Sequence, residues 1–232
     1  MIKMQDIFAE FGHKYCDKHN LPFQSRKAMM NIIACRTSQL GGHVDECDKS
    51  GHTKISYNSC RDRHCPKCQT LSKERWIESR KDDLLPIPYF HVVFTIPHEL
   101  EFLTLTNKKE MYSILFKATS ETLLELSSDS KFLGAEIGFT TILHTWGQNL
   151  RNHTHIHNIV PSGGLSLDGQ RWVNSKKDFF IPVKVLSRKF HRKFLYYLKQ
   201  DYYDNKFKFI NEIEDLKHKY IFQCFVDRLY KK

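Results

Sequence analysis

The 232-residue sequence contains no run of about 18 apolar residues, and the segment after its first residue is polar and amphipathic. It therefore lacks the pattern of a membrane-spanning helix and that of a secretory signal. Its content of 41% hydrophobic and 13% aromatic residues is that of a folded globular protein rather than a disordered one. We expect one or two domains in the cytoplasm, without a membrane partner.

Acidic residues are scarce relative to basic ones: 26 Asp and Glu against 36 Lys and Arg, a net charge of +10. This balance favours a polyanionic partner, and nucleic acid before a membrane surface. Between Ile181 and Gln200 there is no acidic residue, and basic and aromatic side chains interleave. Two interpretations stay open: a strand of DNA along a basic helix face, or a solvated basic face above a packed aromatic stripe. The candidate DNA contacts are Lys184, Arg188, Lys189, Arg192 and Lys193.

The cysteines, seven in number, cannot all pair, and Cys47, Cys60, Cys65 and Cys68 fall within 22 positions. Without an export signal, such thiols predict metal binding rather than disulfide bonds. Cys65-Pro66-Lys67-Cys68 has the spacing of a zinc knuckle, in which two thiolates hold one tetrahedral ion. We therefore expect a structural zinc site here.

The remaining zinc ligands are less defined by the sequence. A second cysteine pair would need a thiol at position 50, next to Cys47, but Ser50 stands there, and a hydroxyl is a poor zinc ligand. Cys47 stays a candidate, and the fourth ligand is open among Cys60, His64, His52 and His43. Arg61, Arg63 and Lys67 lie between these ligands, so the module would present positive charge suited to phosphate contacts.

A second metal motif lies in the stretch 152–161, which has the β-branched composition of a strand. Because side chains alternate along a strand, His155 and His157 project from one face, with Ile156 on the other. Two neighbouring imidazoles form half of a divalent-metal site. The preceding strand, 137–147, would pair with this one as a hairpin, so either His144 or Gln148 could supply a third ligand. No carboxylate lies nearby, which disfavours a metal-dependent hydrolase.

The remaining patterns predict an α+β chain. Pro86 and Pro88 indicate a boundary between a helical zinc-binding domain (1–85) and an antiparallel-sheet domain (86–232). The expected helices are two within 1–34, then 69–85, 108–127, one from 182 onward, and 206–229. The expected strands are 89–96, central in its sheet because it is apolar on both faces, then 137–147 and 152–161, and a hairpin around Asp168-Gly169.

Three stretches together carry a family resemblance. The stretch 57–69 (YNSCRDRHCPKCQ) resembles the zinc-binding domain of bacterial rolling-circle insertion-sequence transposases of the ninety-one type. The stretch 90–100 (FHVVFTIPHEL) resembles the first strand motif of their catalytic domain. His144-Thr145-Trp146-Gly147-Gln148, running on to His155-Ile156-His157 and the segment 163–166, resembles their metal-binding motif.

The resemblance implies an endonuclease of the HUH superfamily, in which an antiparallel sheet carries the histidine pair. By position, the resemblance makes His155 and His157 ligands of a catalytic Mg²⁺ or Mn²⁺ ion, with His144 or Gln148 as the third ligand. It makes the zinc ion structural. The family acts on single-stranded transposon ends, without a small-molecule substrate. A tyrosine attacks the metal-polarised phosphate and leaves a 5′ phosphotyrosine link.

The sequence departs from this family in the spacing of its tyrosines. The family's nucleophilic tyrosines lie four residues apart on one helix, and no two tyrosines of this chain have that spacing. We therefore expect a C-terminally truncated transposase that lacks the tyrosine helix and does not nick DNA alone. The alternative is a catalytically inactive DNA-binding fragment, a regulator or a remnant.

Overall fold

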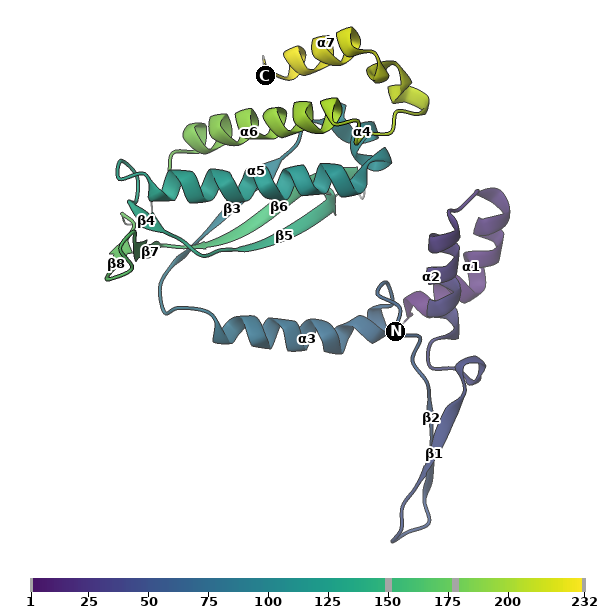
Figure 1. Cartoon of the computed structure of the whole chain (residues 1–232). Helices are drawn as coiled ribbons and strands as arrows, with labels where there is room; N and C mark the ends of the chain where they lie inside the picture. The colour runs from purple at the N-terminus through teal and green to yellow at the C-terminus, as the bar shows by residue number, and fades with distance from the viewer. Residues whose placement is uncertain (1, 149–151, 177–179, 231–232) are drawn as a thin grey trace. The chain divides into compact units, whose positions relative to one another are not determined.

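The computed structural model describes residues 2–148, 152–176 and 180–230. The chain divides into two compact units, residues 1–84 and 85–232, here called the N-terminal and the C-terminal unit (Figure 1). The chain is α+β, as the sequence predicts. Among the described residues, no helix is long and apolar enough to cross a membrane.

The N-terminal unit consists of three helices and a two-stranded ribbon. Helix α1 (Met4–Lys18) and helix α2 (Phe23–Ala34) are separated at Pro22, the N-cap of α2, because proline cannot continue the preceding helix. A short 3-10 turn, η1 (Ser38–Leu40), leads into the antiparallel ribbon of β1 (Gly42–Glu46) and β2 (Thr53–Tyr57). Helix α3 (Pro66–Asp82) begins with proline at its first position, where the missing N–H costs nothing.

The hydrophobic core of this unit is very small. Among its described residues, the buried hydrophobic side chains are Met29, Ile32, Cys35 and Cys65. Every ribbon residue except Ser56 is exposed, and an isolated two-stranded ribbon is at best marginally stable in water. A domain with so little buried apolar surface needs another source of stability, such as a bound metal.

The C-terminal unit contains two three-stranded antiparallel sheets and a layer of helices (Figure 1). The first sheet has the order β3 (Tyr89–Thr95), β6 (Asn152–Pro161), β5 (Thr140–Trp146). The expectation that the strand at 89–96 is central was wrong: β3 is an edge strand, and the histidine-bearing β6 is central. The apolar residues of β3 alternate between a packed face and a half-exposed one, so they do not mark burial on both sides.

The second sheet is smaller and has the order β4 (Ala135–Glu136), β7 (Gly163–Ser166), β8 (Trp172–Asn174). Its β7–β8 hairpin turns at Gly169, whose φ of +70° favours glycine, as the Asp168-Gly169 dipeptide predicts. The connection between β5 and β6 includes residues 149–151, which lie outside the described residues.

Register divides the first sheet into two faces. Directly paired residues share a face, and the pairs His144↔His155 and Val93↔His157 place the histidines together. On the opposite face lie Phe94, Ile156 and Val160, all buried. Asn158, fully buried on that face, donates to Val92 O (3.0 Å) and accepts from Thr141 Oγ1 (2.8 Å). Because this amide bonds to both neighbouring strands, it opposes a register shift that would move the histidines into the core.

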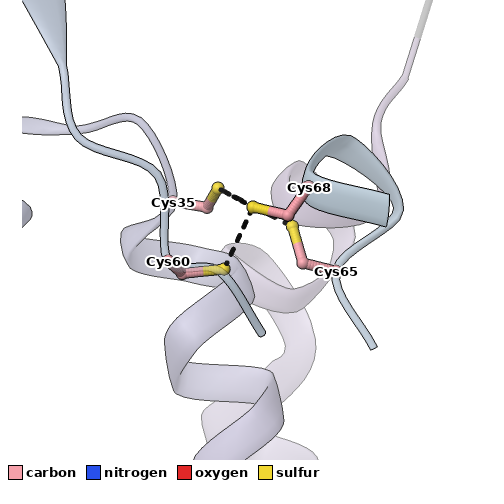
Figure 2. A group of neighbouring side chains, drawn as sticks. All are labelled: Cys35, Cys60, Cys65 and Cys68. Carbon is pink, nitrogen blue, oxygen red and sulfur yellow. Dashed lines mark hydrogen bonds between the residues drawn. The ribbon is translucent and has the colours of Figure 1, made fainter. Parts of the chain in front are cut away.

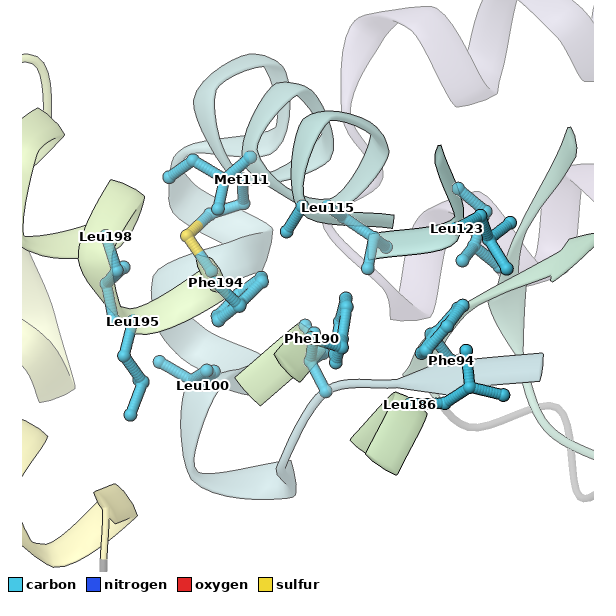
Figure 3. Close-up of a cluster of buried hydrophobic side chains, with 14 of the residues drawn as sticks. Phe94, Leu100, Met111, Leu115, Leu123, Leu186, Phe190, Phe194, Leu195 and Leu198 are labelled. Carbon is cyan, nitrogen blue, oxygen red and sulfur yellow. The ribbon is translucent and has the colours of Figure 1, made fainter. Parts of the chain in front are cut away.

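The opposite face packs on helices α5 (Lys108–Ser128) and α6 (Val183–Tyr203), with η2 (His98–Leu100) and α4 (Glu101–Thr106) beside them. Figure 3 shows this core, in which Phe94 of β3 stacks on Phe190 of α6 at 4.6 Å between ring centroids. The chain then continues through η3 (Asn211–Lys217) to α7 (Lys219–Tyr230). The single helix expected over 206–229 is therefore wrong: Ile210 is extended and Asn211 has a φ of 53°, which interrupts helical geometry.

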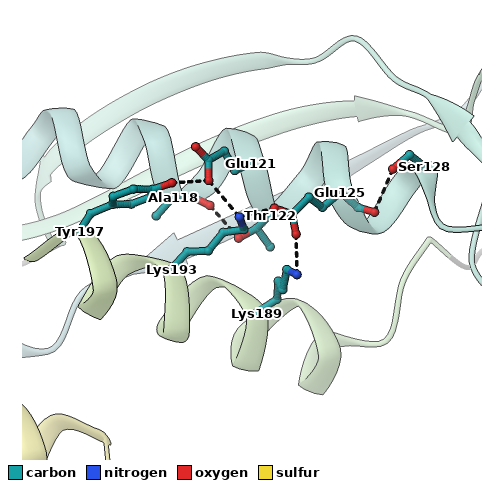
Figure 4. A network of polar contacts seen from close by, with 8 residues as sticks. All are labelled: Ala118, Glu121, Thr122, Glu125, Ser128, Lys189, Lys193 and Tyr197. Carbon is teal, nitrogen blue, oxygen red and sulfur yellow. Dashed lines mark hydrogen bonds and ion pairs between the residues drawn. The ribbon is translucent and has the colours of Figure 1, made fainter. Parts of the chain in front are cut away.

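The basic segment of α6 is partly a packing surface. Lys193 pairs with Glu121 at 2.9 Å and also with Glu125, and Lys189 pairs with Glu125, both acids lying on α5 (Figure 4). The Tyr197 hydroxyl donates to Glu121 at 2.6 Å. Burial raises the pKa of Glu121, but hydrogen bonds from Tyr197 and Lys193 outweigh it and hold this pKa below its usual value. The DNA contacts of Lys189 and Lys193 stay a prediction, and the structure shows that both lysines also neutralise acids of a neighbouring helix.

Replacing Lys193 by methionine is expected to destabilise the C-terminal unit. The change leaves Glu121 and Glu125 short of a cation in a partly buried network, which should cost about 1–2 kcal/mol in the free energy of unfolding. Urea denaturation followed by circular dichroism measures this cost. Arg192→Met on the exposed side of α6 is the matched control and should leave stability unchanged.

Candidate metal centres

Four cysteines of the N-terminal unit converge on one point (Figure 2). Cys65 is the N-cap of α3 and Cys68 lies in its first turn, while Cys35 caps the C-terminus of α2 and Cys60 follows β2. The Sγ–Sγ distances are 3.5 Å for Cys35–Cys68, 3.6 Å for Cys60–Cys68 and 3.6 Å for Cys35–Cys65. All four sulfurs lie within 4.8 Å of one another, and Cys35 and Cys65 are buried.

These distances fit a zinc ion. A tetrahedron with Zn–S bonds of about 2.3 Å has edges of about 3.8 Å, close to the observed separations. Burial raises the pKa of Cys35 and of Cys60. Burial also acts to raise the pKa of Cys68, but hydrogen bonds from Cys35 and Cys60 lower it to about 7. A divalent cation would offset the cost of ionising several buried thiols together.

The structure does not bring two of the predicted zinc ligands to this cluster. Cys47 is exposed in the turn of the ribbon, where its carbonyl accepts from Gly51 N at 2.8 Å. His64 is exposed, and its Nε2 accepts from Arg63 Nε at 3.1 Å. His43 and His52 are likewise outside the four-cysteine group. The corrected set is Cys35, Cys60, Cys65 and Cys68; Cys35 lies at the end of a helix, 25 positions before Cys60, and forms no short-range motif with it.

Of the three basic residues near these cysteines, Arg61 and Arg63 are exposed. Lys67 is partly buried and donates to Gln5 Oε1, which ties α3 to α1. The four-cysteine cluster therefore holds two exposed arginines on a short, constrained loop.

A cluster of imidazoles lies on the first sheet of the C-terminal unit. His144 of β5, with His155 and His157 of β6, places ligand nitrogens within 4.8 Å of one another. The ring centroids of His144 are 4.3 Å from those of His157 and 5.3 Å from those of His155. Of the two predicted third ligands, the structure brings His144 to the pair, whereas Gln148 is exposed in the turn beyond β5.

A fourth histidine, which the motifs did not single out, supports this cluster. His91 on edge strand β3 faces the same side as His157, and their rings stack at 4.9 Å with an interplanar angle of 6°. His91 Nε2 lies 2.6 Å from His157 Nδ1. The signal available in the sequence was the period of two, which places His91 and Thr95 on one face of their strand and Phe90, Val92 and Phe94 on the other.

The hydrogen bonds of His155 and His157 leave one ring nitrogen of each residue available. His155 Nδ1 lies 2.6 Å from the His153 carbonyl oxygen and therefore donates to it, which leaves Nε2 as an acceptor. His157 Nδ1 is engaged by His91, and His157 Nε2 is buried without a hydrogen-bond partner. Burial first, and then the positive potentials of His144, His155 and His91, lower the pKa of His157. Neutral imidazoles with the second nitrogen held in place are the form that binds divalent metals.

Replacing His91 by alanine is expected to weaken Mn²⁺ binding at this cluster by about 10- to 100-fold, the usual effect of losing a residue that orients a metal ligand. His91→Gln, which keeps an acceptor, should restore part of the affinity. Titration of Mn²⁺ followed by electron paramagnetic resonance measures it. His98→Ala, an exposed histidine after β3, should bind Mn²⁺ as the wild type does.

Comparison with known families assigns both parts of the chain. Residues 7–96 match the family described as "Transposase zinc-binding domain", and residues 138–232 match the family described as "Putative transposase". The N-terminal and C-terminal regions thus each match a family of transposase domains. These matches confirm the resemblance to insertion-sequence transposases of the ninety-one type that the motifs carry.

Two curated relatives have significant similarity to the chain. "Putative transposase y4qJ" of Sinorhizobium fredii is 46% identical over 230 residues, which cover 99% of this chain and 58% of the relative. "Transposase for insertion sequence element IS801" of Pseudomonas savastanoi pv. phaseolicola is 32% identical over 150 residues, 64% of this chain and 35% of the relative. The chain thus spans little more than half the length of the first relative and about a third of the second.

Among solved structures, the chain is similar to the conjugative relaxase TrwC in complex with oriT DNA. A metal-bound structure of that complex has a TM-score of 0.40 and 14% identity, covering 47% of this chain and 42% of the relaxase chain. A TrwC complex with a 27-mer DNA has a TM-score of 0.38 and 17% identity, covering 47% of this chain and 44% of that one.

Proposed function

We propose that the chain provides the DNA-binding and metal-holding parts of a transposase that cuts and joins single-stranded transposon ends. The observation that carries this proposal is the histidine cluster: three imidazoles converge, and the buried Nε2 of His157 has no other partner. The surrounding sheet face is open, with Val93 and Ile159 exposed by 42% and 40%. A phosphodiester can therefore approach the cluster from solvent.

The residues divide the work as follows. His144, His155 and His157 would hold a divalent cation, Mg²⁺ or Mn²⁺, which would polarise the scissile phosphate. His91 fixes the ring of His157 and keeps its Nδ1 occupied. Asn158 holds the register that keeps the histidines on the open face. In the N-terminal unit, Cys35, Cys60, Cys65 and Cys68 would hold a structural zinc ion that supports basic residues for DNA contacts.

Among the described residues, no tyrosine of α6 or of the first sheet is placed as a nucleophile at this cluster. Helix α6 packs on the opposite face of the sheet, and the Tyr197 hydroxyl is bonded to Glu121. Tyr89 is the one tyrosine on the three described strands of this sheet, and its hydroxyl accepts from Leu85 N at 2.8 Å. Tyr89 is four strand positions from Val93, the partner of His157, which is about 13 Å along the strand. The chain alone therefore holds DNA and metal without forming the covalent link.

Incubation with labelled single-stranded DNA tests this function. The wild-type chain should bind the oligonucleotide more tightly when Mn²⁺ is added, and His155→Ala with His157→Ala should abolish the gain. No adduct should survive denaturing electrophoresis. A covalent, protease-sensitive adduct would show that a tyrosine of this chain does attack, and binding indifferent to Mn²⁺ in the wild type would remove the histidine cluster from the DNA site.

The tyrosine geometry also favours a second candidate: a DNA-binding regulator that occupies transposon ends without cutting them. The two candidates differ in one measurement. When the chain is mixed with an intact transposase of this family, a regulator lowers the nicking rate in proportion to the DNA that it occupies. A chain that contributes its metal site to a shared active centre raises that rate, and His157→Ala removes the increase.

A further inference from the structure

The N-terminal unit contains a cavity that none of the matched motifs explains. It has a volume of about 720 Å³ and lies at the base of the ribbon, between the ends of β1 and β2 and the loops that carry Cys35 and Cys60. Its lining includes Arg36, Arg61, His43 and Tyr57. This volume falls within the range of about 300–1,000 Å³ that is typical of sites for small organic groups, so a nucleotide fits.

The two arginines of this cavity have an unusual backbone conformation. Arg36 has a φ of 60° and Arg61 a φ of 53°, in the left-handed region that favours glycine. Each directly follows a cysteine of the four-cysteine cluster. A non-glycine residue in this conformation costs on the order of 1 kcal/mol and persists where the surrounding structure enforces it. Glycine adopts this conformation without that cost, so arginine at both positions points to a role for the side chains.

The cluster and the ribbon fix where these arginines lie. Asp62 N donates to Cys60 Sγ at 3.4 Å, which closes the turn around Arg61. Arg36 N donates to Asn58 O at 3.0 Å, and Asn58 N donates to Gly41 O at 3.0 Å, so the two loops are joined at the ribbon. Both arginines therefore line the same cavity, and hydrogen bonds hold their backbones in place.

The charge of this cavity is largely uncompensated. Among the described residues, neither Arg36 nor Arg61 has a carboxylate within ion-pair distance. Asp45 of the ribbon accepts from Ser56 at 3.2 Å and lies 3.7 Å from His43, both of which line the cavity. Tyr57 is 44% exposed beside this positive surface. Cationic groups next to an exposed aromatic ring are the combination that binds single-stranded nucleic acid, phosphate on the cations and base on the ring.

We propose that this cavity binds an unpaired nucleotide of DNA, with its phosphate on Arg36 and Arg61 and its base stacked on Tyr57. The inference rests on the proposed function, because it names the place where the N-terminal unit holds the single strand. The ribbon beyond the cavity is not part of this site: its residues from Asp45 to Lys54 carry three acids and two lysines, a poor match to a phosphate backbone.

The experiment uses the full chain with fluorescein-labelled single-stranded DNA, the matching duplex and RNA of the same sequence, over a range of salt concentrations. The double variant Arg36→Gly, Arg61→Gly keeps the left-handed backbone conformation and removes both side chains. It should bind single-stranded DNA at least tenfold more weakly. The slope of log affinity against log salt should fall by about 1.4, since each phosphate contact to a single strand contributes about 0.7.

Two further variants separate contact from structure. Tyr57→Leu should weaken single-strand binding roughly tenfold with no change of salt slope, since stacking does not depend on counterions. Lys49→Ala with Lys54→Ala removes the same charge from the ribbon and should leave binding nearly unchanged. In the glycine variant, the zinc content and the midpoint temperature of thermal unfolding should not fall below those of the wild type. If that variant loses zinc, Arg36→Asn with Arg61→Asn replaces it, because asparagine tolerates the same conformation.

The outcomes distinguish this inference from the proposed function. A wild-type chain that does not bind single-stranded DNA overturns both. If the wild type binds and the zinc-loaded glycine variant binds with the same affinity and salt slope, the assignment of the cavity is overturned and the proposed function is not. A preference for duplex or for RNA, lost in the same variant, overturns its assignment to single-stranded DNA.

Discussion

Replacing Cys35 by serine is expected to remove zinc from the chain and unfold the N-terminal unit. The binding of structural zinc by such domains contributes about 10–16 kcal/mol, and this free energy is effectively folding free energy. Because the described N-terminal unit buries so few other hydrophobic side chains, its hydrophobic core cannot compensate for the loss of the free energy of zinc binding. Metal content measured by mass spectrometry should fall from one zinc per chain to none, and limited proteolysis should cleave within residues 2–84.

Cys47→Ser is the matched control. Cys47 is a cysteine of the same unit, but it is exposed in the ribbon turn and outside the four-cysteine cluster. This variant should keep zinc and protease resistance. A chelator should reproduce the Cys35→Ser result in the wild type and in the control. Zinc retained in Cys35→Ser and lost in Cys47→Ser would favour the ligand set that the local sequence suggested.

Replacing His157 by alanine is expected to abolish Mn²⁺ binding at the histidine cluster while leaving zinc in place. His157 is the central residue of this cluster: its ring contacts those of His91, His144 and His155. Its loss removes one ligand nitrogen and the point around which the other rings converge. Since His157 Nε2 has no hydrogen-bond partner in the protein, the cost to folding should be small, less than about 1.5 kcal/mol.

The control for this second prediction is His153→Ala. His153 is on the same strand and exposed, but it holds His155 through its backbone carbonyl, which the substitution preserves. This variant should bind one Mn²⁺ per chain as the wild type does, with zinc measured in parallel. Equal Mn²⁺ affinity in His157→Ala and the wild type would refute the metal assignment of the cluster.

The local patterns predicted much of this arrangement. The alternation in 152–161 predicted that His155 and His157 share a face, which follows from the two-residue period of a strand. The hairpin with the preceding strand predicted that His144 or Gln148 would be near them, and the structure brings His144 there. The prediction that the strand at 89–96 is central was wrong, because apolar residues on both faces do not require burial of both faces: Val93 is 42% exposed on the edge strand β3.

Contacts between distant segments were not predictable in this way. Cys35 completes the cysteine cluster from a helix end, and His91 reaches His157 across 66 positions, so neither belongs to a local motif. The charges of α6 show the same difference. The sequence of one helix does not identify the helix that packs against it. Only the packing of α6 against α5 revealed that Lys189 and Lys193 neutralise Glu121 and Glu125.

The sequence by itself determined the chemical groups and the family: two metal motifs, an excess of basic charge and the order of the two regions. These are properties of residue type and short spacing, which the chain carries before it folds. Only the tertiary structure decided which cysteine is the fourth of the cluster, which histidine orients His157, and which lysines of α6 pair with acids. Those choices depend on distances between side chains far apart in the chain, and packing and register set such distances.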